Sequence, residues 1–465
     1  MSDRPQRTNT YTALPETDRY KQCLFDWLAA HAPLWNQITY RRRQAYFSED
    51  GDVWDADYTD LYDDYAPLLG KATCQQVARK NSEAWRSHFR LLDTYHDESD
   101  TTVTEKPSPP GYWGTRDDGY ELHGLVRNDL YSFDWHEDTS TLEFGVGDVL
   151  EDRYDFDHNE RITLDVRGNP QWDGDDSRLE LIYDEAANTL RVQHPVRIRP
   201  DTVHEQRLDA FTHTLTLENT TRAAAIDVGA NNTLALVTEQ GDTSVYHARP
   251  EFDRFQTLTN RIAALQSLLP ADQYTSKQIQ RLYDERSRKR DHARDAAVKH
   301  AADWLLEHNV ETVYVGELTD VLETHWAADV NEKTHAFWSH RQLVERIRLT
   351  FEDVGITVTE VSERDSSSEC PACGSDAVTR DGDSFRCQTC DVDAHSDVAG
   401  AWNILQREVG PMARPAALGA GRPRDAPGPG AYWQWNGHDW TPTTWEQSSP
   451  VDQPSVGKPA SSQPG

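Results

Sequence analysis

Near the N-terminus, apolar side chains recur with the period of an α-helix. A short strand is expected before them, at residues 6–14, and Thr17 is a suitable N-cap for the first helix. The two apolar helical faces contain Tyr20, Cys23, Leu24, Trp27, Leu28 and His31, then Val77, Ala78, Ala84, Trp85, Phe89 and Leu92. We therefore predict an N-terminal strand or tail over 1–15 and a helical domain over 16–103.

After the Pro-rich linker that begins near residue 104, the apolar period changes to that of a β-strand. Apolar and polar residues alternate in three runs, which the turn sequences RGNP and DGDD separate. The runs contain Leu142, Phe144 and Val146, then Ile162, Leu164 and Val166, then Leu179, Leu181 and Tyr183. This pattern predicts an antiparallel, barrel-like β domain over 104–220.

From Ala223 the pattern changes again, to three strands, a helix, a strand, a helix, a strand and a last helix. That is the order of an RNase H-like α/β domain, which we place at 221–407. The segment 408–465 is rich in Pro, Gly, Ala and Ser and has no apolar periodicity, so it is predicted to be disordered. The fold class expected for the whole chain is α+β, with several domains.

Acidic residues are spread over every segment of the chain, and the formal net charge is −32. Such a charge normally repels nucleic acid. It is also typical of proteins in concentrated salt, where the Debye length falls to about 3 Å. We expect a halophilic cytoplasm, in which the net charge does not decide the partner. Neither a signal peptide nor an apolar run long enough to span a membrane is present, so no membrane partner is expected.

Four of the six cysteines have the spacing C-x2-C-x13-C-x2-C. Zinc accepts four tetrahedral thiolates, and each CxxC turn presents two sulfur atoms to one ion. We predict one structural zinc ion in a ribbon inserted over 366–394, with the ligands Cys370, Cys373, Cys387 and Cys390. The other two, Cys23 and Cys74, are expected to be buried, inert thiols. A ribbon alone is equally compatible with a DNA-binding or a protein-binding module.

Three acidic residues lie in elements that the predicted topology brings together. Asp227 lies in the first strand of the α/β domain, Glu317 ends the fourth, and Asp397 opens the last helix. The first and fourth strands are neighbours in this topology. Converged carboxylates repel one another, and two Mg²⁺ ions relieve this repulsion while they act on a phosphodiester. The three acids therefore predict a two-metal nuclease site.

Each acid also has a simpler interpretation. Asp227 could cap a turn, Glu317 could be a surface acid, and Asp397 could be a helix N-cap. The sequence IDVG is similar to the first phosphate loop of actin and the related chaperone ATPases, but a second Gly-rich loop and an adenosine pocket are missing. The placement of all three acids in the right elements favours the nuclease.

Residues 223–407 resemble the TnpB (OrfB) proteins of insertion sequences, which are relatives of type V CRISPR effectors. The resemblance lies in AIDVGANN, in VYVGEL and in the segment from HRQLVERIRL through SSSECPACG and FRCQTC to HSDVAGAWNIL. It implies RNA-guided, metal-dependent cleavage of DNA at a RuvC-like site, with Mg²⁺ or Mn²⁺. By resemblance Asp227, Glu317 and Asp397 match the catalytic acids and the four cysteines match the zinc ligands. The helical and β-rich parts resemble the family's recognition and wedge regions. The implied partners are target DNA, a guide RNA from the protein's own element and a companion transposase.

The chain departs from the family pattern at the last motif. Ser396 follows His395 where Arg is common, and Ala399 and Gly400 stand where the family commonly has Asn and Ala. Because the acids are intact, we expect catalysis to be retained and substrate contacts to be weakened.

Residues 277–300 form a basic island of net charge +4 in the acidic chain. A solvated helix with internal ion pairs would explain it, but contact with a nucleic-acid backbone near the active site is preferred. The candidate contacts are Arg281, Arg286, Arg288, Lys289, Arg290 and Arg294, with Arg341 on a later helix. Arg41, Arg42 and Arg43 form either a solvated face or a phosphate contact.

The sequence favours an RNA-guided DNA endonuclease and leaves two other functions open. One is a nuclease-inactive regulator that binds DNA or RNA. The other is an unguided transposase or resolvase that acts at element ends.

Overall fold

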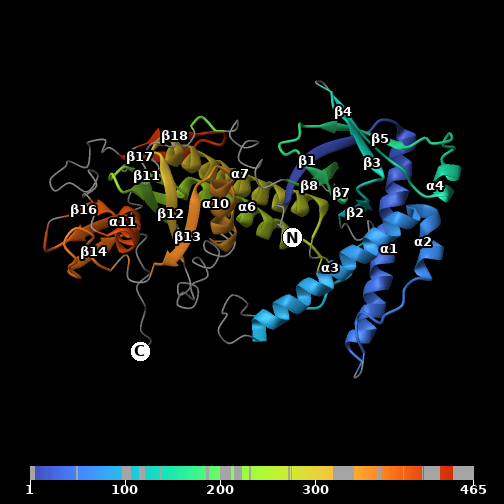
Figure 1. The fold of residues 1–465 in the computed structure, drawn as a ribbon, viewed down its shortest axis with the longest axis horizontal. Helices are drawn as coiled ribbons and strands as arrows, with labels where there is room; N and C mark the ends of the chain where they lie inside the picture. Colours follow the sequence, from blue (N-terminus) through green and yellow to red (C-terminus); the bar gives the residue numbers. More distant parts are fainter. Residues whose placement is uncertain are drawn as a thin grey trace, which may run out of the picture. The chain divides into compact units, whose positions relative to one another are not determined.

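The computed structural model of the 465-residue chain forms two compact units, residues 1–206 with 270–281, and residues 207–269 with 282–465 (Figure 1). The structure describes residues 6–48, 51–96, 106–114, 121–136, 139–184, 188–198, 211–213, 222–229, 232–270, 273, 275–317, 340–363, 366, 368–390, 392–410, 412 and 430–443. No helix within these described ranges is long and apolar enough to cross a membrane.

The first unit contains three helices, and the apolar period predicted the first and the third of them. They are α1 (Asp18–Tyr46), α2 (Leu61–Leu69) and α3 (Lys71–His96). Thr17 caps α1 as expected, since its Oγ1 accepts a hydrogen bond of 3.1 Å from the Tyr20 N–H.

An antiparallel sheet with the order β2-β7-β8-β1-β5-β4-β3 completes this unit, and β6 pairs with β8. Its elements are β1 (Gln6–Pro15), β2 (Leu122–Val126), β3 (Tyr131–Asp134), β4 (Ser140–Phe144), the short helix α4 (Asp148–Arg153), β5 (Ile162–Arg167), β6 (Asp175–Asp176), β7 (Leu179–Asp184) and β8 (Thr189–Arg197). The predicted strand at 6–14 lies in the middle of the sheet, between β8 and β5. Among the described strands the path ends at β2 and β3 without a pairing between them, so the barrel closure that we expected is not observed.

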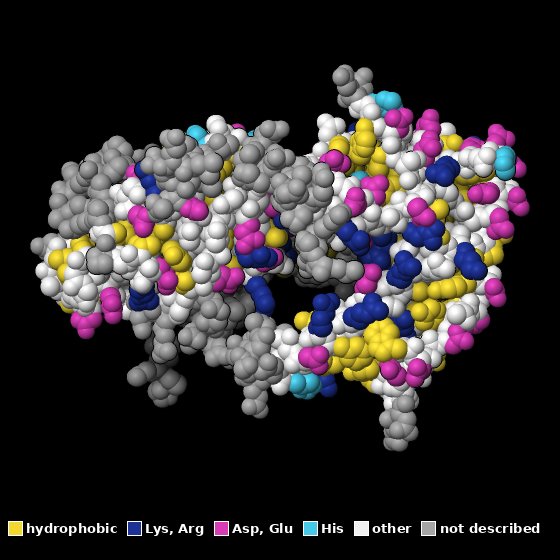
Figure 2. All heavy atoms as spheres, in the orientation of Figure 1, with side chains coloured by type: hydrophobic (Ala, Val, Ile, Leu, Met, Phe, Trp, Pro, Cys, Tyr) yellow, Lys and Arg dark blue, Asp and Glu magenta, His cyan; other side chains and the backbone are white. Residues whose placement is uncertain are grey.

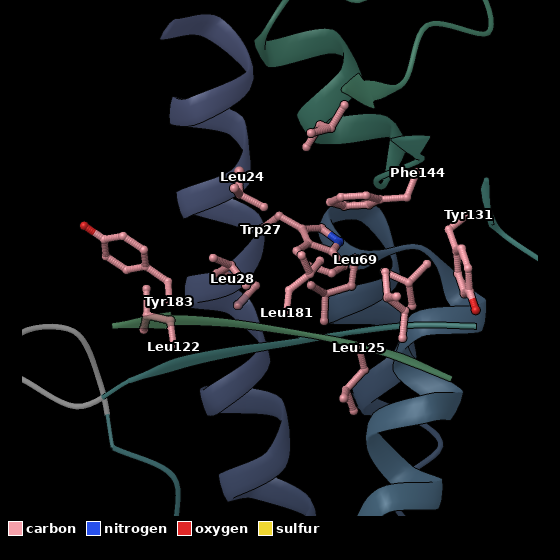
Figure 3. Close-up of a cluster of buried hydrophobic side chains, with 14 of the residues drawn as sticks. Leu24, Trp27, Leu28, Leu69, Leu122, Leu125, Tyr131, Phe144, Leu181 and Tyr183 are labelled. Carbon is pink, nitrogen blue, oxygen red and sulfur yellow. The ribbon is translucent and has the colours of Figure 1, made fainter. Parts of the chain in front are cut away.

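The helices and the sheet share one hydrophobic core (Figure 3). Trp27 and Leu28 of α1 pack with Leu125 of β2, Phe144 of β4 and Leu181 of β7, and all five side chains are fully buried. The sequence treated these helices and strands as separate domains, but their apolar faces cover each other, and the chain folds here as one unit.

The second unit contains a sheet with the order β13-β12-β9-β10-β11-β17-β18. Its strands up to β13 are β9 (Arg222–Asp227), β10 (Asn232–Thr238), β11 (Thr243–His247), β12 (Val310–Glu317) and β13 (Thr357–Ser362). β9, β10 and β11 are antiparallel neighbours, whereas β12 lies parallel to both β9 and β13. The predicted pairing of the first strand with the fourth is therefore confirmed.

Helices cover both faces of this sheet, and β9 contributes to both cores. The helices are α6 (Arg249–Gln266), α7 (Lys277–Glu307), α10 (His340–Asp353) and α11 (Ser396–Val409). Ala224 and Ile226 pack in the core that contains α7 and α10, while Ala223 and Ala225 pack in the core that contains α11. The alternation of β9 between two apolar layers explains why its sequence is a continuous apolar run.

The prediction of disorder over 408–465 is wrong for residues 430–443. They form a hairpin of β17 (Gly430–Trp435) and β18 (Trp440–Thr443), and β17 pairs in parallel with β11 (Figure 1). Trp435 and Trp440 are buried in the core with α7, and Trp433 Nε1 donates a hydrogen bond of 3.0 Å to Ser244 Oγ. The three tryptophans of this hairpin supply the apolar area that stabilises it. The overall composition of 408–465 does not reveal this area.

Candidate active site and cysteine cluster

The four cysteines that the spacing predicted as ligands form one cluster. All four sulfur atoms lie within 4.8 Å of one another. The Sγ atoms of Cys370 and Cys390 are 3.5 Å apart, and those of Cys373 and Cys387 are 3.7 Å apart. Sulfur atoms at 2.3 Å from a tetrahedral zinc ion would be separated by about 3.8 Å, so the cluster fits one such ion. Cys23 and Cys74 are buried elsewhere, as predicted.

A small antiparallel sheet carries the cluster and leads directly into α11. Its strands are β14 (Val378–Asp381), β15 (Ser384–Cys387) and β16 (Asp393–His395). The Ser396 N–H donates a hydrogen bond of 2.8 Å to Asp383 O, and Asp383 forms an ion pair of 2.8 Å with Arg249. Asn403 Nδ2 of α11 donates to Ser366 O at 2.6 Å and to Glu369 O at 2.9 Å. The ribbon thus holds α11 at its first residue and, through Asn403, in its middle.

The first turn of α11 positions Asp397. His395 caps this helix, because its Nδ1 accepts a hydrogen bond of 3.2 Å from the Asp397 N–H. Burial lowers the pKa of His395, so its ring is neutral and Nδ1 can accept. Ser396, in the place where the family commonly has Arg, is buried and its Oγ lies 3.3 Å from Gly382 O. A long charged side chain would not fit there without a rearrangement of the ribbon.

Asp227, the last residue of β9, lies against this same turn. A methyl group on Gly400 would lie only 2.3 Å from Asp227 Oδ2. Glycine at this position, where the family commonly has Ala, therefore leaves room for the Asp227 carboxylate. Asn232 Nδ2 donates a hydrogen bond of 2.8 Å to Asp397 Oδ2. The structure thus brings Asp227 and Asp397 together, as the sequence predicted.

Glu317 is the last residue of β12, and its Cα pairs in register with Ser362 of β13. Its side chain lies outside the part of the chain that the structure describes, so its role as the third acid stays a prediction. Backbone register alone puts Glu317 at the end of the strand that neighbours β9.

Glu363 is a further acid that sequence reasoning missed. It follows β13, and a methyl group on Gly316 of β12 would lie 2.7 Å from Glu363 Oε2. The Glu363 carboxylate therefore lies over the end of β12. No motif marks this residue in the sequence, and only the pairing of β12 with β13 brings it to the site.

Two of these acids, Asp227 and Glu363, have raised pKa values. Burial, together with the negative charges of Asp397 and Glu363, raises the pKa of Asp227 well above its ordinary value. Burial raises the pKa of Glu363 to about 7. Among the described residues, Asp227 has neither an ion pair nor a hydrogen-bond donor at its carboxylate. Buried carboxylate oxygens that form no ion pair suit a hard divalent cation such as Mg²⁺.

Glu363 should give the metal-free protein a characteristic pH dependence. Its pKa is about 7 in the folded state against an ordinary value of 4.5, so the folded protein holds this proton more tightly. The free energy of unfolding should therefore decrease as the pH rises from about 4.5 to 7, by about 1–3 kcal/mol from this residue. Chemical denaturation with chelator present, at intervals of half a pH unit, measures the slope. Glu363→Gln should flatten it, whereas Glu360→Gln, an exposed acid on β13, should not. An unchanged slope in Glu363→Gln would contradict the assignment.

Most of the candidate nucleic-acid contacts on α7 have partners within the chain. Lys289 pairs with Glu285, and Arg290 and Arg294 pair with Asp291. The Arg286 guanidinium lies over the Phe255 ring at 4.6 Å from its centroid. Arg288 is exposed and has no hydrogen bond or ion pair with a described residue, while Arg281 and Arg341 are exposed and do have interactions. These contacts favour the solvated-helix interpretation for part of the island, and the nucleic-acid contacts stay predictions.

The three consecutive arginines of α1 also have partners within the first unit. Arg42 is buried and donates to Asn81 Oδ1 at 2.7 Å, Arg41 pairs with Asp60, and Arg43 donates to Pro110 O at 3.1 Å. Neither a wholly solvated face nor a phosphate contact describes the buried Arg42.

A basic cleft in the first unit went unnoticed in the sequence. It has a volume of about 410 Å³, and four arginines line it with three acids and several amides. The lining arginines are Arg79, Arg127, Arg178 and Arg197. The side chains of Arg79 and Arg197 are exposed and form no hydrogen bond or ion pair with a described residue. Figure 2 shows that Lys and Arg side chains gather on the visible face of this unit.

Comparison with known proteins places the chain among related sequences. A family model described as a probable transposase, OrfB of IS605, matches residues 193–322, and a Cas12f1-like TNB domain matches residues 340–404. The TnpB-like protein ORF457 of Acidianus two-tailed virus is 26% identical over 422 residues, which cover 87% of each chain. The CRISPR-associated endodeoxyribonuclease Cas12f1 of Sulfoacidibacillus thermotolerans is 25% identical over 130 residues, 28% of this chain and 29% of that protein.

A solved structure shows the same fold. The cryo-EM structure of a Cas12f1–sgRNA–target DNA complex has a TM-score of 0.55 at 11% identity, over 87% of this chain and 99% of that chain. The α+β chain therefore has a Cas12f-like fold. These matches confirm the resemblance that the motifs indicated, and the chain is identified as a relative of the TnpB (OrfB) proteins of IS605-type elements and of the Cas12f1-like nucleases.

Proposed function

We propose that this chain is an RNA-guided DNA endonuclease with a RuvC-like site formed by Asp227, Asp397 and Glu317. The observation that carries the proposal is the convergence of Asp227 and Asp397, from β9 and α11, with neither an ion pair nor a hydrogen-bond donor at the Asp227 carboxylate among the described residues. A structural zinc ribbon, with the four clustered cysteines as ligands, supports α11.

Some residues of the site would bind the cations, and others orient the residues that bind them. Two divalent cations, when bound, would neutralise the charge on the phosphodiester and activate the attacking water. Asp227 and Asp397 offer carboxylate oxygens for these cations, and Asn232 and His395 hold Asp397 by its carboxylate and its backbone N–H. Glu363 adds a third described carboxylate at the end of β12, close to the position of Glu317.

The basic cleft of the first unit is the surface there that suits a phosphate backbone. The side chains of Arg79 and Arg197 are exposed in this cleft without an ion pair to a described residue, so their guanidinium groups can bind a phosphate. A Cas12f1 with the same fold was solved in complex with sgRNA and target DNA. We propose that guide RNA or target DNA contacts this cleft, in addition to the candidate contacts on α7 and α10.

The proposal can be tested on the purified full chain, prepared both in ordinary buffer and in molar KCl. Sequencing of the nucleic acid that copurifies should give one abundant RNA that maps to the 3′ end of the gene's own element. The complex should then cut matching DNA with Mg²⁺ or Mn²⁺. The double variant Arg79→Ala/Arg197→Ala should retain less RNA or DNA as the salt concentration rises, while Arg161→Ala, at an exposed arginine outside the cleft, should behave as wild type.

The same experiment separates the alternatives. Bound nucleic acid without cleavage under either metal would support the nuclease-inactive regulator. Strand transfer or junction resolution without RNA would support an unguided transposase. A folded, zinc-loaded protein with no discrete RNA and no cleavage would overturn the proposed function.

A further inference from the structure

A continuous path of side chains connects the C-terminal hairpin to the Asp397 carboxylate. Asn232 Nδ2 donates to Asp397 Oδ2, and Asn232 Oδ1 lies 2.8 Å from His247 Nδ1. The His247 ring in turn stacks on the Tyr432 ring of β17, with centroids 5.7 Å apart and planes 9° apart. We propose that Tyr432, His247 and Asn232 are positioning residues for Asp397, so that the C-terminal hairpin is a working part of the active site. This inference rests on the proposed function.

The hydrogen-bond chemistry allows one arrangement of this path. A carboxylate only accepts, so the amide nitrogen of Asn232 must face Asp397 and its oxygen must face His247. Burial lowers the pKa of His247 to about 3, so the ring is neutral and carries one N–H, which lies on Nδ1 to serve Asn232 Oδ1. His247 Nε2 is then the acceptor, and it is buried without a partner among the described residues.

Burial makes this arrangement rigid. Asn232 is 1% exposed and His247 is 3% exposed, so water cannot replace either hydrogen bond. An unsatisfied buried polar group costs about 1–3 kcal/mol, which disfavours any rotation of the Asn232 amide. Asn232, which lies on β10 and not on α11, therefore fixes the orientation of the Asp397 carboxylate.

Tyr432 closes the path from the side of the hairpin. Its ring also lies 6.0 Å from the His395 ring, whose Nδ1 accepts from the Asp397 N–H. One aromatic side chain thus contacts both histidines that act on Asp397, one through the carboxylate and one through the backbone. β17 holds Tyr432 there through its parallel pairing with β11, which carries His247.

Successive side chains of β17 point to opposite faces of the sheet. The residue that acts on Asp397 and the residues that anchor the hairpin therefore lie on different faces. Trp433 faces the other layer, where its ring lies 4.4 Å from the His300 ring and its Nε1 donates to Ser244. Trp435 lies in the same layer as Trp433, beside His292. Trp433→Phe therefore removes one hydrogen bond from the anchor and touches nothing on the Asp397 side, which makes it a matched control.

The test is Mn²⁺ binding to the full-length, zinc-loaded protein, followed by electron paramagnetic resonance without any cleavage. Groups that orient metal ligands typically change metal affinity by 10–100-fold. Asn232→Ala and Tyr432→Ala should each weaken Mn²⁺ binding by about tenfold or more, with unchanged zinc content. Tyr432→Phe, which keeps the ring, should bind Mn²⁺ as wild type does. Trp433→Phe should lower the melting temperature without changing the Mn²⁺ affinity.

The outcomes distinguish this inference from the proposed function. If wild type binds Mn²⁺, Asp227→Asn abolishes binding and Asn232→Ala and Tyr432→Ala do not weaken it, the positioning role is overturned and the nuclease site stands. If Trp433→Phe weakens Mn²⁺ binding as much as Tyr432→Ala, the hairpin contributes stability alone and the inference also fails. If wild type binds no Mn²⁺ that depends on Asp227, both the inference and the metal site fail.

Discussion

Asp227→Asn should abolish DNA cleavage and, in the same protein, raise the melting temperature measured with chelator present. The loss of activity should be at least about a hundredfold, the size of effect that single stabilising groups have in active sites. The gain in stability follows because burial and two neighbouring acids disfavour the Asp227 carboxylate in the folded, metal-free protein. A neutral amide of the same shape removes about 1–2 kcal/mol of this cost, equivalent to roughly 2–8 °C.

A thermal scan with and without Mn²⁺ measures both parts of this prediction. Wild type should be stabilised by Mn²⁺, and Asp227→Asn should not be. Asp242→Asn, which changes an acid in the turn between β10 and β11, is the matched control and should leave cleavage and the Mn²⁺ effect intact. Retained cleavage in Asp227→Asn would exclude this carboxylate from the catalytic site.

Cys387→Ser should release the bound zinc and, with it, the start of α11. Structural zinc contributes about 10–16 kcal/mol to the folding of small zinc domains, so the ribbon should not stay folded without it. The hydrogen bonds from Ser396 to Asp383 and from Asn403 to the segment before Cys370 would then be lost. Asp397 would lose its position, and cleavage should fall with the zinc content.

Zinc stoichiometry by elemental analysis, together with limited proteolysis of 366–395, tests this prediction. Wild type should contain about one zinc per chain, and the Cys387→Ser ribbon should be cut rapidly. Cys74→Ser changes a buried thiol of the first unit and should keep its zinc. Full activity in a zinc-free Cys387→Ser protein would show that the ribbon does not support the site.

The sequence predicted those parts of the molecule whose chemistry or periodicity is local. Four cysteines in two CxxC turns need no tertiary information, because only one arrangement satisfies a tetrahedral ion. The strand order around β9 followed from apolar runs that indicated strands and helices in the order of an RNase H-like domain. That order placed Asp227 beside the helix of Asp397.

Other parts depend on contacts between distant segments, which no local pattern reveals. Glu363 looks like an ordinary acid in a Ser-rich stretch, and it reaches the site because β13 pairs with β12. In the sheet β1 lies between β8 and β5. In the sequence, more than a hundred residues separate β1 from each of these two strands. The hairpin at 430–443 was hidden by the composition of its neighbours, because the prediction considered its four aromatic residues together with the whole Pro-, Gly-, Ala- and Ser-rich segment 408–465.

The pairing of β17 with β11 can form only late in the synthesis of the chain. About 180 residues separate His247 from Gly430 in the sequence, and ribosomes add roughly 5–20 residues per second. The edge of β11 therefore stays open for roughly 10–40 s on each nascent chain. An open edge strand is a template for pairing with other chains. A chain that ends between α11 and β17 would be nearly complete, with an unpaired edge at β11 and without the Tyr432 contact that we propose for Asp397. Termination there should give an insoluble, inactive product.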